Sequence, residues 1–441
     1  MSKARADYDS LPYPKVVVVG GGFAGLQVIK GLSGAPYKVL LLDKQNHHCF
    51  QPLLYQVATA SLSADSIAHP FRTTIAPMAN VAFRMCTVQG VDPVGKVVHT
   101  DRGEVEYDIL VIATGSTTNF FGNDRMEQEA MQLKSISQAL DIRSDFLQDF
   151  EAALYAQDEA GQRRCLNFIV VGAGPTGVEM AGSLAEIRRT VLKNEYRELN
   201  SDRMQIWLVD SNDRVLKNFS EKSSAKAQRY LNEMGVHLKL GARVAHYDGE
   251  AVTFTSGEVM ESHTVLWAAG VKGVLLPGLE AAEVPKANRY GVDRYNQLNG
   301  IPDVFALGDV ALMNEGAWER GHPQVAPAAI QQAELLVKNL QRRASGRPML
   351  PFTYKDKGSM ATIGRYKAVV DAGNIHVGGL LAWLGWMFVH LMALVGYRNR
   401  LQVLAGWAWK YISWKNTIRL IIRPYVRKAT VTEQEVAAPI H

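Results

Sequence analysis

The sequence predicts an α/β fold built from two similar domains, the second inserted in the first, followed by a helical C-terminal region. Two glycine-rich turns, at residues 20–25 and 172–177, each follow an apolar strand and open a helical stretch. A third strand-to-turn segment, at residues 301–309, lies far beyond the second turn. Residues 378–396 are almost entirely apolar. Strands that alternate with helices predict parallel sheets, and the apolar stretch predicts a separate helical tail.

The composition agrees with a globular chain of two or three domains. Of 441 residues, 47% are hydrophobic and 21% are charged, which argues against extensive disorder. The three cysteines, Cys49, Cys86 and Cys165, form no CxxC pair, so we expect neither a zinc knuckle nor a dithiol redox centre. The same cysteine pattern fits a reducing compartment, and because residues 1–14 lack an apolar leader, we expect no secretory signal.

The first glycine turn lies between two apolar strands, residues 15–19 and the strand that ends at Asp43. In such a turn the first glycine permits a tight bend, the second admits a pyrophosphate, and the third lets helix and strand pack closely. The pyrophosphate lies at the helix N-terminus, where free N–H groups and the dipole favour negative charge. The residues of this turn are Gly20, Gly21, Gly22, Phe23, Ala24 and Gly25.

The second turn repeats this plan. Strand residues 168–171 precede it, a helix is expected from about Val178, and the next strand ends at Asp210. Each copy also has a later strand that ends in a glycine turn, 95 residues after the first motif glycine at Gly115 and 98 residues after it at Gly270. Two complete copies predict Rossmann-like dinucleotide-binding domains rather than chance glycine turns. The glycines and threonine of this second turn are Gly172, Gly174, Thr176 and Gly177.

The acids Asp43 and Asp210 indicate which dinucleotides bind. A carboxylate at this position accepts hydrogen bonds from ribose hydroxyls and repels a 2′-phosphate. Residues 211–213 offer no basic side chain to such a phosphate. We therefore expect the second site to prefer NADH over NADPH, although a solvated acid that merely ends a strand is the alternative.

The segment at residues 301–309 delivers Gly308 and Asp309 to a turn. After two dinucleotide motifs, such a segment is expected to return to the first domain and to place its carboxylate on the ribityl chain of a flavin. The predicted domains are therefore residues 12–125 with 295–350 for FAD, residues 160–290 for NADH, and a C-terminal region at 351–430.

Together these elements resemble the two-dinucleotide-binding flavoproteins. Three further runs narrow the resemblance to type II NADH dehydrogenase, the single-subunit NADH:quinone oxidoreductase, from Val16 to about Tyr425. The runs are residues 46–58 with Asn46-His47-His48 and FQPLLYQVA, residues 325–333 with VAPAAIQQA, and residues 356–362 with DKGSMAT.

The resemblance implies roles for individual residues. Asp43 and Lys44 are expected beside the FAD adenosine and Asp309 on its ribityl chain. The turn of Ala329 and Ile330, together with Lys357, is expected at the isoalloxazine ring, where a lysine would stabilise the reduced anion; a plain surface lysine is the alternative. The remaining residues that we place at the cofactor sites are Val88, Ala113, Thr114, Gly115 and Gly270.

Two residues are candidates for turnover. Glu179 matches the family glutamate near the nicotinamide, although a first-turn glutamate that interacts with its own helix dipole is the alternative. Gln331 matches the second glutamine of the quinone-region pattern AQxAxQ, whereas Pro327 replaces the first, and Gln332 should point elsewhere on a helix. His47 and His48 lack further ligands at local spacing, so we expect no metal.

The C-terminal region carries the basic charge of the chain. Residues 372–432 contain eight lysines and arginines and no acid, so the rest of the chain is net negative although the total is +5. Beyond 378–396, an apolar series at three- and four-residue spacing is interleaved with cations. The apolar series is Leu404, Trp407, Tyr411, Trp414, Ile418 and Ile421, and the cations are Lys410, Lys415, Arg419 and Arg423.

This pattern predicts monotopic attachment to anionic lipid. Five of the eight tryptophans lie in this tail, at positions 383, 386, 407, 409 and 414, and tryptophan favours the membrane interface. The alternatives are a helical hairpin that covers the domain core or forms a dimer contact, and a single membrane span over 378–396. His390, within the apolar stretch, is expected to be packed or hydrogen-bonded rather than a proton donor.

The expected activity is hydride transfer from NADH to FAD and then two-electron transfer to a quinone, without ion pumping. We therefore expect NADH, quinone and membrane lipid as partners and no nucleic acid, at the cytoplasmic face of the inner (cytoplasmic) membrane. The family resemblance also implies a homodimer. Disulfide reductases and sulfide:quinone oxidoreductases need cysteine pairs that this chain lacks. The alternatives are a soluble FAD-dependent NAD(P)H reductase of another acceptor and a non-enzymatic FAD/NADH-sensing membrane protein.

Overall fold

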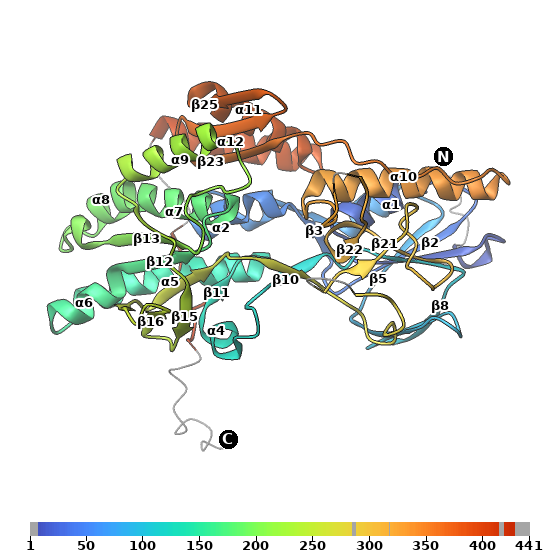
Figure 1. The fold of residues 1–441 in the computed structure, drawn as a ribbon, viewed down its shortest axis with the longest axis horizontal. Coiled ribbons are helices and arrows are strands. Elements are labelled where there is room, and N and C mark those ends of the chain that lie inside the picture. The colour runs from blue at the N-terminus through green and yellow to red at the C-terminus, as the bar shows by residue number, and fades with distance from the viewer. Residues whose placement is uncertain (1–7, 285–287, 317, 414–418, 428–441) are drawn as a thin grey trace, which may run out of the picture. The chain divides into compact units, whose positions relative to one another are not determined.

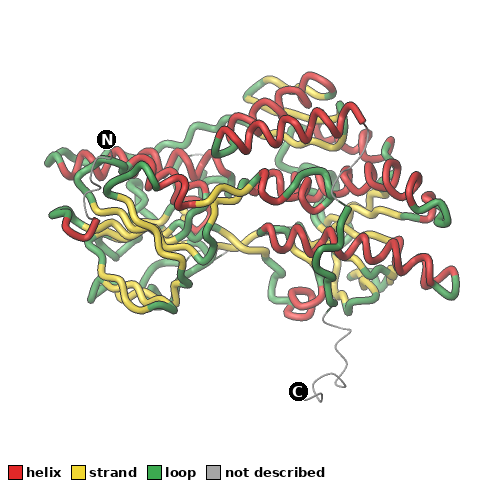
Figure 2. The backbone as a smooth tube through the Cα atoms, turned by 180° about the vertical axis from the view of Figure 1, so that it is seen from behind, coloured by secondary structure: helices red, strands yellow, loops and turns green. Residues whose placement is uncertain are grey.

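The computed structural model describes residues 8–284, 288–316, 318–413 and 419–427. The chain, drawn in Figures 1 and 2, divides into two compact units, and each unit draws on three separate stretches of the sequence. Unit 1 consists of residues 1–49, 68–117 and 271–357, and unit 2 of residues 50–67, 118–270 and 358–441. The predicted ranges of the FAD-binding, NADH-binding and C-terminal regions stay predictions.

Unit 1 is built on a five-stranded parallel sheet. Its strands, in sheet order, are β21 (Val304–Ala306), β9 (Ile109–Ile112), β1 (Lys15–Val19), β2 (Lys38–Asp43) and β5 (Val81–Met85). All of β9 and all of β1 except its first residue are buried, as expected for parallel strands covered on both faces. The segment at 301–309 thus returns to the first sheet as an edge strand, as predicted.

Three helices and several small sheets complete unit 1. Helix α1 (Phe23–Gly31) follows the first glycine turn and packs against the long helix α10 (Ala326–Ala344), which lies above it in Figure 1. The remaining elements are β3 (His47–Cys49), β4 (Ala68–Pro70), α3 (Phe71–Ile75), β6 (Val88–Asp92), β7 (Val97–Thr100), β8 (Gly103–Glu106), β10 (Ser116–Thr118), β19 (Val271–Gly273), β20 (Tyr290–Gly291) and β22 (Ala311–Leu312).

Unit 2 contains a second five-stranded parallel sheet with the same internal order. Its strands, in sheet order, are β11 (Met131–Gln132), β18 (Thr264–Trp267), β12 (Asn167–Val171), β13 (Gln205–Asp210) and β14 (His237–Leu240). In both units the strand before the glycine turn is central, with the acid-bearing strand on one side and the later glycine-turn strand on the other. The predicted duplication of an α/β fold is therefore confirmed.

The helix after the second glycine turn begins earlier than expected. Helix α7 spans Pro175–Ile187, three residues before the predicted start at Val178, because proline suits the first helical position, where its missing N–H is not needed. The other elements around this sheet are α4 (Asp124–Glu129), α5 (Ile136–Tyr155), α6 (Glu159–Leu166), α8 (Lys193–Glu195), α9 (Glu221–Glu233), β15 (Val244–Tyr247), β16 (Ala251–Phe254) and β17 (Val259–Glu261).

Two further segments belong to unit 2. Helix α2 (Leu54–Ala58) interrupts the first part of the chain and packs against α5 and α7. After residue 357 an antiparallel sheet packs on α7 and α9, and two helices follow it (Figure 1). These last elements are β23 (Ser359–Gly364), β24 (Lys367–Ala372), β25 (Ile375–Gly378), α11 (Leu380–Ala393) and α12 (Tyr397–Ser413).

Candidate functional site

The first glycine of each turn is in the left-handed region and faces a backbone carbonyl. Gly20 has φ +99° and Gly172 has φ +107°. A Cβ on Gly20 would lie 2.4 Å from the carbonyl oxygen of Ala113, and a Cβ on Gly172 would lie 2.5 Å from that of Ala268. Only glycine fits at either position, which is why both turns begin with it.

The second and third glycines of the first turn have the same surroundings as their counterparts in the second turn. A Cβ on Gly25 would lie 1.9 Å from the carbonyl oxygen of the first glycine in its turn, and the same distance for Gly177 is 1.8 Å. By contrast, a Cβ on Gly22 or Gly174 would meet no atom within 4 Å. The third glycine therefore closes the strand–helix contact, and the second leaves open backbone that a pyrophosphate group can approach.

The two acids that end the next strands make equivalent contacts. Asp43 Oδ2 accepts a hydrogen bond from the Gly21 N–H at 2.6 Å, and Asp210 Oδ2 accepts one from the Ala173 N–H at 2.5 Å. Burial raises the pKa of Asp43, although the N–H groups of Gln45 and Gly21 and the exposed Lys44 oppose the change. Each acid is thus held beside the second residue of its glycine turn, where a ribose would lie.

His48 supports the first glycine turn. Its Nδ1–H donates to the Gly21 carbonyl oxygen at 3.0 Å, and its ring meets Phe23 edge-on. Burial lowers the pKa of His48 to about 4, so the ring is neutral at physiological pH. His47 Nδ1–H donates to the side-chain oxygen of its neighbour Asn46 at 2.9 Å, and His47 lies opposite Pro70 in the pairing of β3 with β4. This pair of histidines therefore serves packing and backbone support within unit 1.

The turn that carries Asp309 is held by three amide and hydroxyl side chains. Ser116 Oγ donates to Asp309 Oδ2 at 2.5 Å, and Gln324 Nε2 donates to the Asp309 carbonyl oxygen at 3.0 Å. Buried Gln332 accepts the Gly308 N–H through Oε1 at 2.7 Å. Sequence reasoning missed Gln332 because it set this amide aside as pointing elsewhere on the helix.

Gln331 holds the segment that leads to Lys357. Its Nε2 donates to the Lys355 carbonyl oxygen and its Oε1 accepts the Lys355 N–H, both at 3.0 Å. Lys357 is exposed two residues later. We predicted a turn at Ala329 and Ile330, but these residues lie near the start of helix α10. The N-cap residue of α10 makes no side-chain hydrogen bond to the helix.

The other predicted residues of unit 1 lie along its strands. Thr114 Oγ1 donates to the Val274 carbonyl oxygen at 2.6 Å, beside buried Ala113. Gly115 has φ +68° and open space where a side chain would be. Val88 is half-buried at the start of β6 and packs against the unit 1 core.

In unit 2 the predicted residues lie at the carboxyl ends of β12, β13 and β18. Thr176 is exposed in the first turn of α7. Gly270 follows β18, and a Cβ there would lie 3.1 Å from the ring of exposed Phe121. Asp210 also accepts both the backbone N–H and the side-chain amide of Asn212, each at 2.7 Å. These residues share one edge of the sheet, where parallel α/β folds bind ligands.

Glu179 is buried inside unit 2 rather than exposed on a first helical turn. It is the fifth residue of α7, is 9% exposed, and its Oε1 accepts the Thr362 N–H at 3.4 Å. Burial raises the pKa of Glu179 to about 8, although Thr362 and the Trp386 indole lower it in part. The carboxyl group therefore holds a proton at neutral pH.

Aromatic and amide side chains from α2, α11 and α12 lie near this acid. Gln56 Nε2 donates to the Tyr55 hydroxyl at 2.8 Å, and Trp407 Nε1 donates to Gln56 Oε1 at 2.7 Å. Trp386 stacks on His390 with ring centroids 4.1 Å apart, and His390 Nδ1–H donates to the Trp386 carbonyl oxygen at 2.7 Å. Burial lowers the pKa of His390 to about 4, which agrees with the packed interpretation of this histidine.

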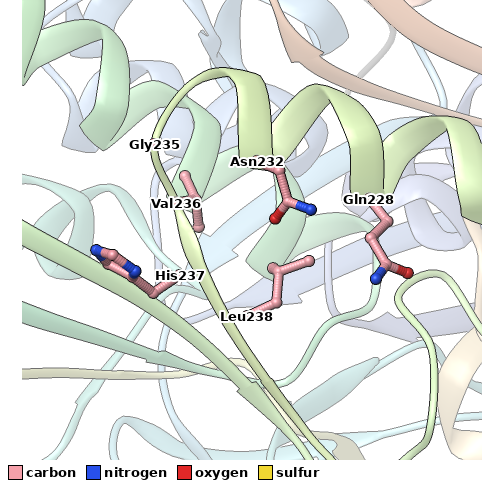
Figure 3. A pocket seen from close by; sticks show the side chains of 6 residues that line it. All are labelled: Gln228, Asn232, Gly235, Val236, His237 and Leu238. Carbon is pink, nitrogen blue, oxygen red and sulfur yellow. The ribbon is translucent and has the colours of Figure 1, made fainter.

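A pocket of about 390 Å³ lies elsewhere in unit 2, between the end of α9 and the start of β14 (Figure 3). His237 at its rim is the first residue of β14, so the pocket lies toward the amino end of that strand. The glycine turn and Asp210 lie at the carboxyl ends of the strands, so this pocket is not the predicted dinucleotide site.

The C-terminal helices bury one side and expose another. Trp383 and Trp386 of α11 and Trp407 of α12 are buried, and α11 packs on β24. Contrary to the predicted apolar stripe, Leu404 is 46% exposed while Trp407 is buried. The exposed large apolar residues of these helices are Leu380, Leu381, Leu384, Phe388, Val389, Met392, Tyr397, Leu401, Leu404, Trp409 and Ile412.

Several cations of this region are paired inside unit 2. Lys410, whose side chain is 15% exposed, pairs with Glu186 at 2.8 Å and also donates to Ser61 at 3.1 Å. Arg419 pairs with Glu195 at 2.7 Å. The expectation that Lys410 faces lipid headgroups is therefore wrong. The predicted contributions of Trp414, Lys415 and Ile418 lie outside the described residues.

Membrane spans were one alternative for the tail. Among the described residues, no helix combines the length and the apolar character that crossing a membrane requires.

Comparisons with known proteins cover nearly the whole chain. Residues 14–333 match the pyridine nucleotide-disulphide oxidoreductase family, and residues 357–416 match the NDH2 C-terminal domain. The chain is 36% identical over 414 residues to the type II NADH:quinone oxidoreductase Ndh of Mycobacterium tuberculosis, covering 90% of this chain and 88% of that one. It is 31% identical to the type II NADH:quinone oxidoreductase of Staphylococcus saprophyticus, with 80% and 89% covered.

Solved structures agree at the level of the fold. NDH2 of Plasmodium falciparum in complex with NADH superposes with a TM-score of 0.85 at 19% identity, covering 93% of this chain and all of that one. The sulfide:quinone oxidoreductase of Aquifex aeolicus gives a TM-score of 0.66 at 18% identity, with 92% and 96% covered. The predicted fold class and the family resemblance are thereby confirmed. The chain belongs to the type II NADH:quinone oxidoreductase family, within the pyridine nucleotide-disulphide oxidoreductases.

Proposed function

We propose that this chain is an FAD-dependent NADH:quinone oxidoreductase that moves two electrons from NADH to a membrane quinone without pumping ions. The observation that carries the proposal is the paired geometry of the two turns. Each turn has one open glycine that admits a pyrophosphate and one carboxylate held beside it. A chain with two complete dinucleotide sites is suited to bind both NADH and FAD and to transfer electrons from the first to the second.

Unit 1 is the proposed FAD site. The open backbone at Gly22 accommodates the FAD pyrophosphate at the N-terminus of α1, and Asp43 accepts the hydroxyls of the adenosine ribose. Asp309, which Ser116 orients, accepts ribityl hydroxyls. When bound, FAD accepts hydride from NADH and releases two electrons to quinone.

The start of α10 and Lys357 are proposed to face the isoalloxazine ring. The uncapped N-terminus of a 19-residue helix presents free N–H groups and a positive dipole end, which attract negative charge. Lys357 adds a full positive charge, and Gln331 fixes its approach by holding Lys355 at two points. Pro327 fits here because the second helical position needs no N–H donor, so its presence is compatible with the site.

Unit 2 is the proposed NADH site. The open Gly174 at the N-terminus of α7 accommodates the pyrophosphate, and Asp210 receives the ribose hydroxyls. The nearest following cations are engaged elsewhere, since Arg214 donates to the carbonyl oxygens of Phe219 and Lys217, and Lys217 pairs with Asp213. A 2′-phosphate would therefore meet a carboxylate and no free cation among these residues, which supports a preference for NADH.

Glu179 is proposed to act in turnover as a proton-holding acid. Its carboxyl group is buried and protonated at neutral pH, so it can supply a proton or a hydrogen bond without the cost of a buried charge. Gln331, the second residue proposed for turnover, uses both its amide groups on Lys355, so its action on quinone is through the segment it holds.

The proposed location is the cytoplasmic face of the inner (cytoplasmic) membrane, with peripheral attachment and a homodimer as the assembly. The apolar side of α11 supports attachment, because Leu381, Leu384 and Phe388 follow one another at helical spacing and are 73%, 49% and 66% exposed. Such a surface inserts shallowly among lipid headgroups and acyl chains.

Anaerobic titration of the purified, FAD-loaded protein with NADH tests the activity. We expect the visible flavin absorbance to bleach at one equivalent of NADH and to recover when a short-chain quinone is added. Bleaching without recovery would replace the proposal by a soluble reductase of another acceptor. Absence of bleaching would favour a non-enzymatic protein that senses FAD and NADH. NADPH in place of NADH should bleach the flavin far more slowly.

A flotation assay with lipid vesicles tests the location. We expect the wild-type protein to float with vesicles and the variant Phe388→Glu to remain in solution with its FAD content and NADH reaction unchanged. The matched control is Tyr155→Glu, since Tyr155 is 80% exposed on α5 of the same unit, outside the C-terminal region. Equal flotation of all three proteins would contradict attachment through α11.

A further inference from the structure

A cluster of three different ligand side chains lies in unit 2, apart from the dinucleotide site. Asp149, Cys165 and His263 place one carboxylate oxygen, one sulfur and one ring nitrogen within 4.8 Å of one another. Cys165 Sγ is 3.7 Å from His263 Nδ1, which is in turn 3.8 Å from Asp149 Oδ1. Nothing in the proposed NADH or quinone chemistry uses these groups.

The fold brings these residues together from three elements. Cys165 precedes β12 and His263 precedes β18, and these two strands run parallel and in register, with Phe168 opposite Thr264. Asp149 approaches from α5, which packs on α6. The cluster therefore lies at the amino ends of the strands, whereas the glycine turn lies at their carboxyl ends.

We propose that Asp149, Cys165 and His263 form a zinc-binding site. In tetrahedral zinc sites, bonds of about 2.0 Å to nitrogen or oxygen and about 2.3 Å to sulfur place neighbouring ligand atoms about 3.5 Å apart. The two distances to His263 Nδ1 are only slightly longer than this. Small side-chain movements would therefore bring all three ligands to a common metal ion.

The groups around the cluster make hydrogen bonds to Asp149 and His263, as groups around zinc ligands usually do. Asp149 Oδ2, the oxygen on the far side from His263, accepts from Arg427 at 2.8 Å and from Thr264 Oγ1 at 2.7 Å. The carbonyl oxygen of His263 accepts the Tyr247 hydroxyl at 2.8 Å. Hydrogen bonds of this kind orient the residues that bind the metal directly and are usual around metal sites.

The charges of the cluster also balance with a divalent cation. Arg427 pairs with both Asp145, at 2.7 Å, and Asp149, at 2.8 Å, so its single positive charge offsets one of these two carboxylates. A thiolate at Cys165 and the carboxylate of Asp149 then leave two negative charges that one Zn²⁺ ion neutralises. Asp149 is buried, whereas the His263 side chain is 23% exposed. The fourth coordination position of the metal ion would therefore open to solvent on the side of His263.

Spectroscopic titration with Co²⁺ followed by Zn²⁺ tests the site. The FAD-loaded protein is stripped of metal, its thiols are kept reduced with a phosphine, and difference spectra are recorded as Co²⁺ is added. We expect a thiolate-to-cobalt charge-transfer band that saturates at one equivalent per chain and disappears when one equivalent of Zn²⁺ is added. The readout is independent of turnover, so it stands whether or not the proposed activity is correct.

Variants assign the band to these residues. We expect Cys165→Ser to abolish the band and His263→Gln to weaken Co²⁺ binding by more than about tenfold, since the loss of even a hydrogen-bond partner of a metal ligand typically weakens binding that much. Cys86→Ser, at a buried cysteine of unit 1, and His237→Gln, at an exposed histidine of unit 2, should bind as the wild type does. FAD content verifies the folding of each variant.

Two outcomes would overturn the proposal. One is a wild-type protein that shows no thiolate-to-cobalt band at saturating Co²⁺, a result that needs no variant. The other is a band that persists in Cys165→Ser, which would assign the metal to a different thiol.

Discussion

Replacing Glu179 by glutamine should stabilise the NADH-free, FAD-loaded protein at neutral and alkaline pH but not in acid. The carboxyl group has an ordinary pKa of 4.5, and burial raises its pKa to about 8 in the folded protein. Between these two values the folded chain holds a proton that the unfolded chain releases. The free energy of unfolding therefore falls by about 1.4 kcal/mol for each pH unit in this window.

The size of the effect follows from that window. From pH 4.5 to about pH 7 the wild-type protein loses about 3 kcal/mol by this route, and the loss levels off above about pH 8. Glutamine has nearly the same shape and stays neutral, so the Glu179→Gln protein avoids the loss. The same argument gives no difference below pH 4.5, because both side chains are then neutral.

Urea unfolding measured across this pH range checks the expectation. The difference in unfolding midpoint between Glu179→Gln and the wild type should grow with pH and then become constant. Glu250→Gln, at an exposed glutamate of the same unit, is the control and should show no such growth. A difference that stays flat from acid to alkaline pH would refute the reasoning, since Glu179 would then ionise as an exposed glutamate does.

Three further substitutions probe the geometry of the units. Gly177→Ala should abolish NADH binding, measured by calorimetry, while FAD content is retained, because the added methyl group would overlap the carbonyl oxygen of the first glycine at 1.8 Å. Lys410→Met should destabilise α12 by about 3 kcal/mol, because it leaves Glu186, whose side chain is only 13% exposed, without its paired cation, and hydrogen exchange of α12 should accelerate about 100-fold. Gln332→Leu should lower FAD affinity by freeing the Gly308 N–H, and unchanged FAD retention during dilution would contradict this.

Much of the fold was predictable from local signals. The β-branched strands, the glycine turns and the acids follow rules of short range, so Asp43 and Asp210 were placed at the correct strand ends. The start of α7 was misjudged because Pro175 was counted with the turn, although proline favours the first helical position. Residues 50–67 belong to unit 2 because α2 packs against α5 and α7. These contacts join distant parts of the sequence, so no local pattern predicts them.

The side-chain contacts were less predictable than the backbone. Gln332 was dismissed from its helical phase, yet it is the amide that holds the Gly308 turn. Burial raises the pKa of Glu179, and the groups that partly oppose this rise, the Thr362 N–H and the Trp386 indole, lie far along the sequence, beyond the reach of any local pattern. The cluster with Cys165 escaped notice because its ligands are distant in sequence and meet only when β12 and β18 pair.

The C-terminal region shows how a charge pattern can be misread when only the sequence is known. Its cations recur at helical spacing and predict attraction to anionic lipid, but Lys410 and Arg419 pair with acids of unit 2, and Arg427 lies between two buried aspartates of α5. Pairing within the chain neutralises these charges, so the proposed membrane attachment rests mainly on the exposed apolar side of α11. Apolar insertion depends little on ionic strength, whereas attraction between exposed charges is screened within about 8 Å at physiological salt. Flotation with vesicles should therefore persist at high salt. A loss of flotation at high salt would instead show that attraction between the cations and anionic lipid dominates the binding.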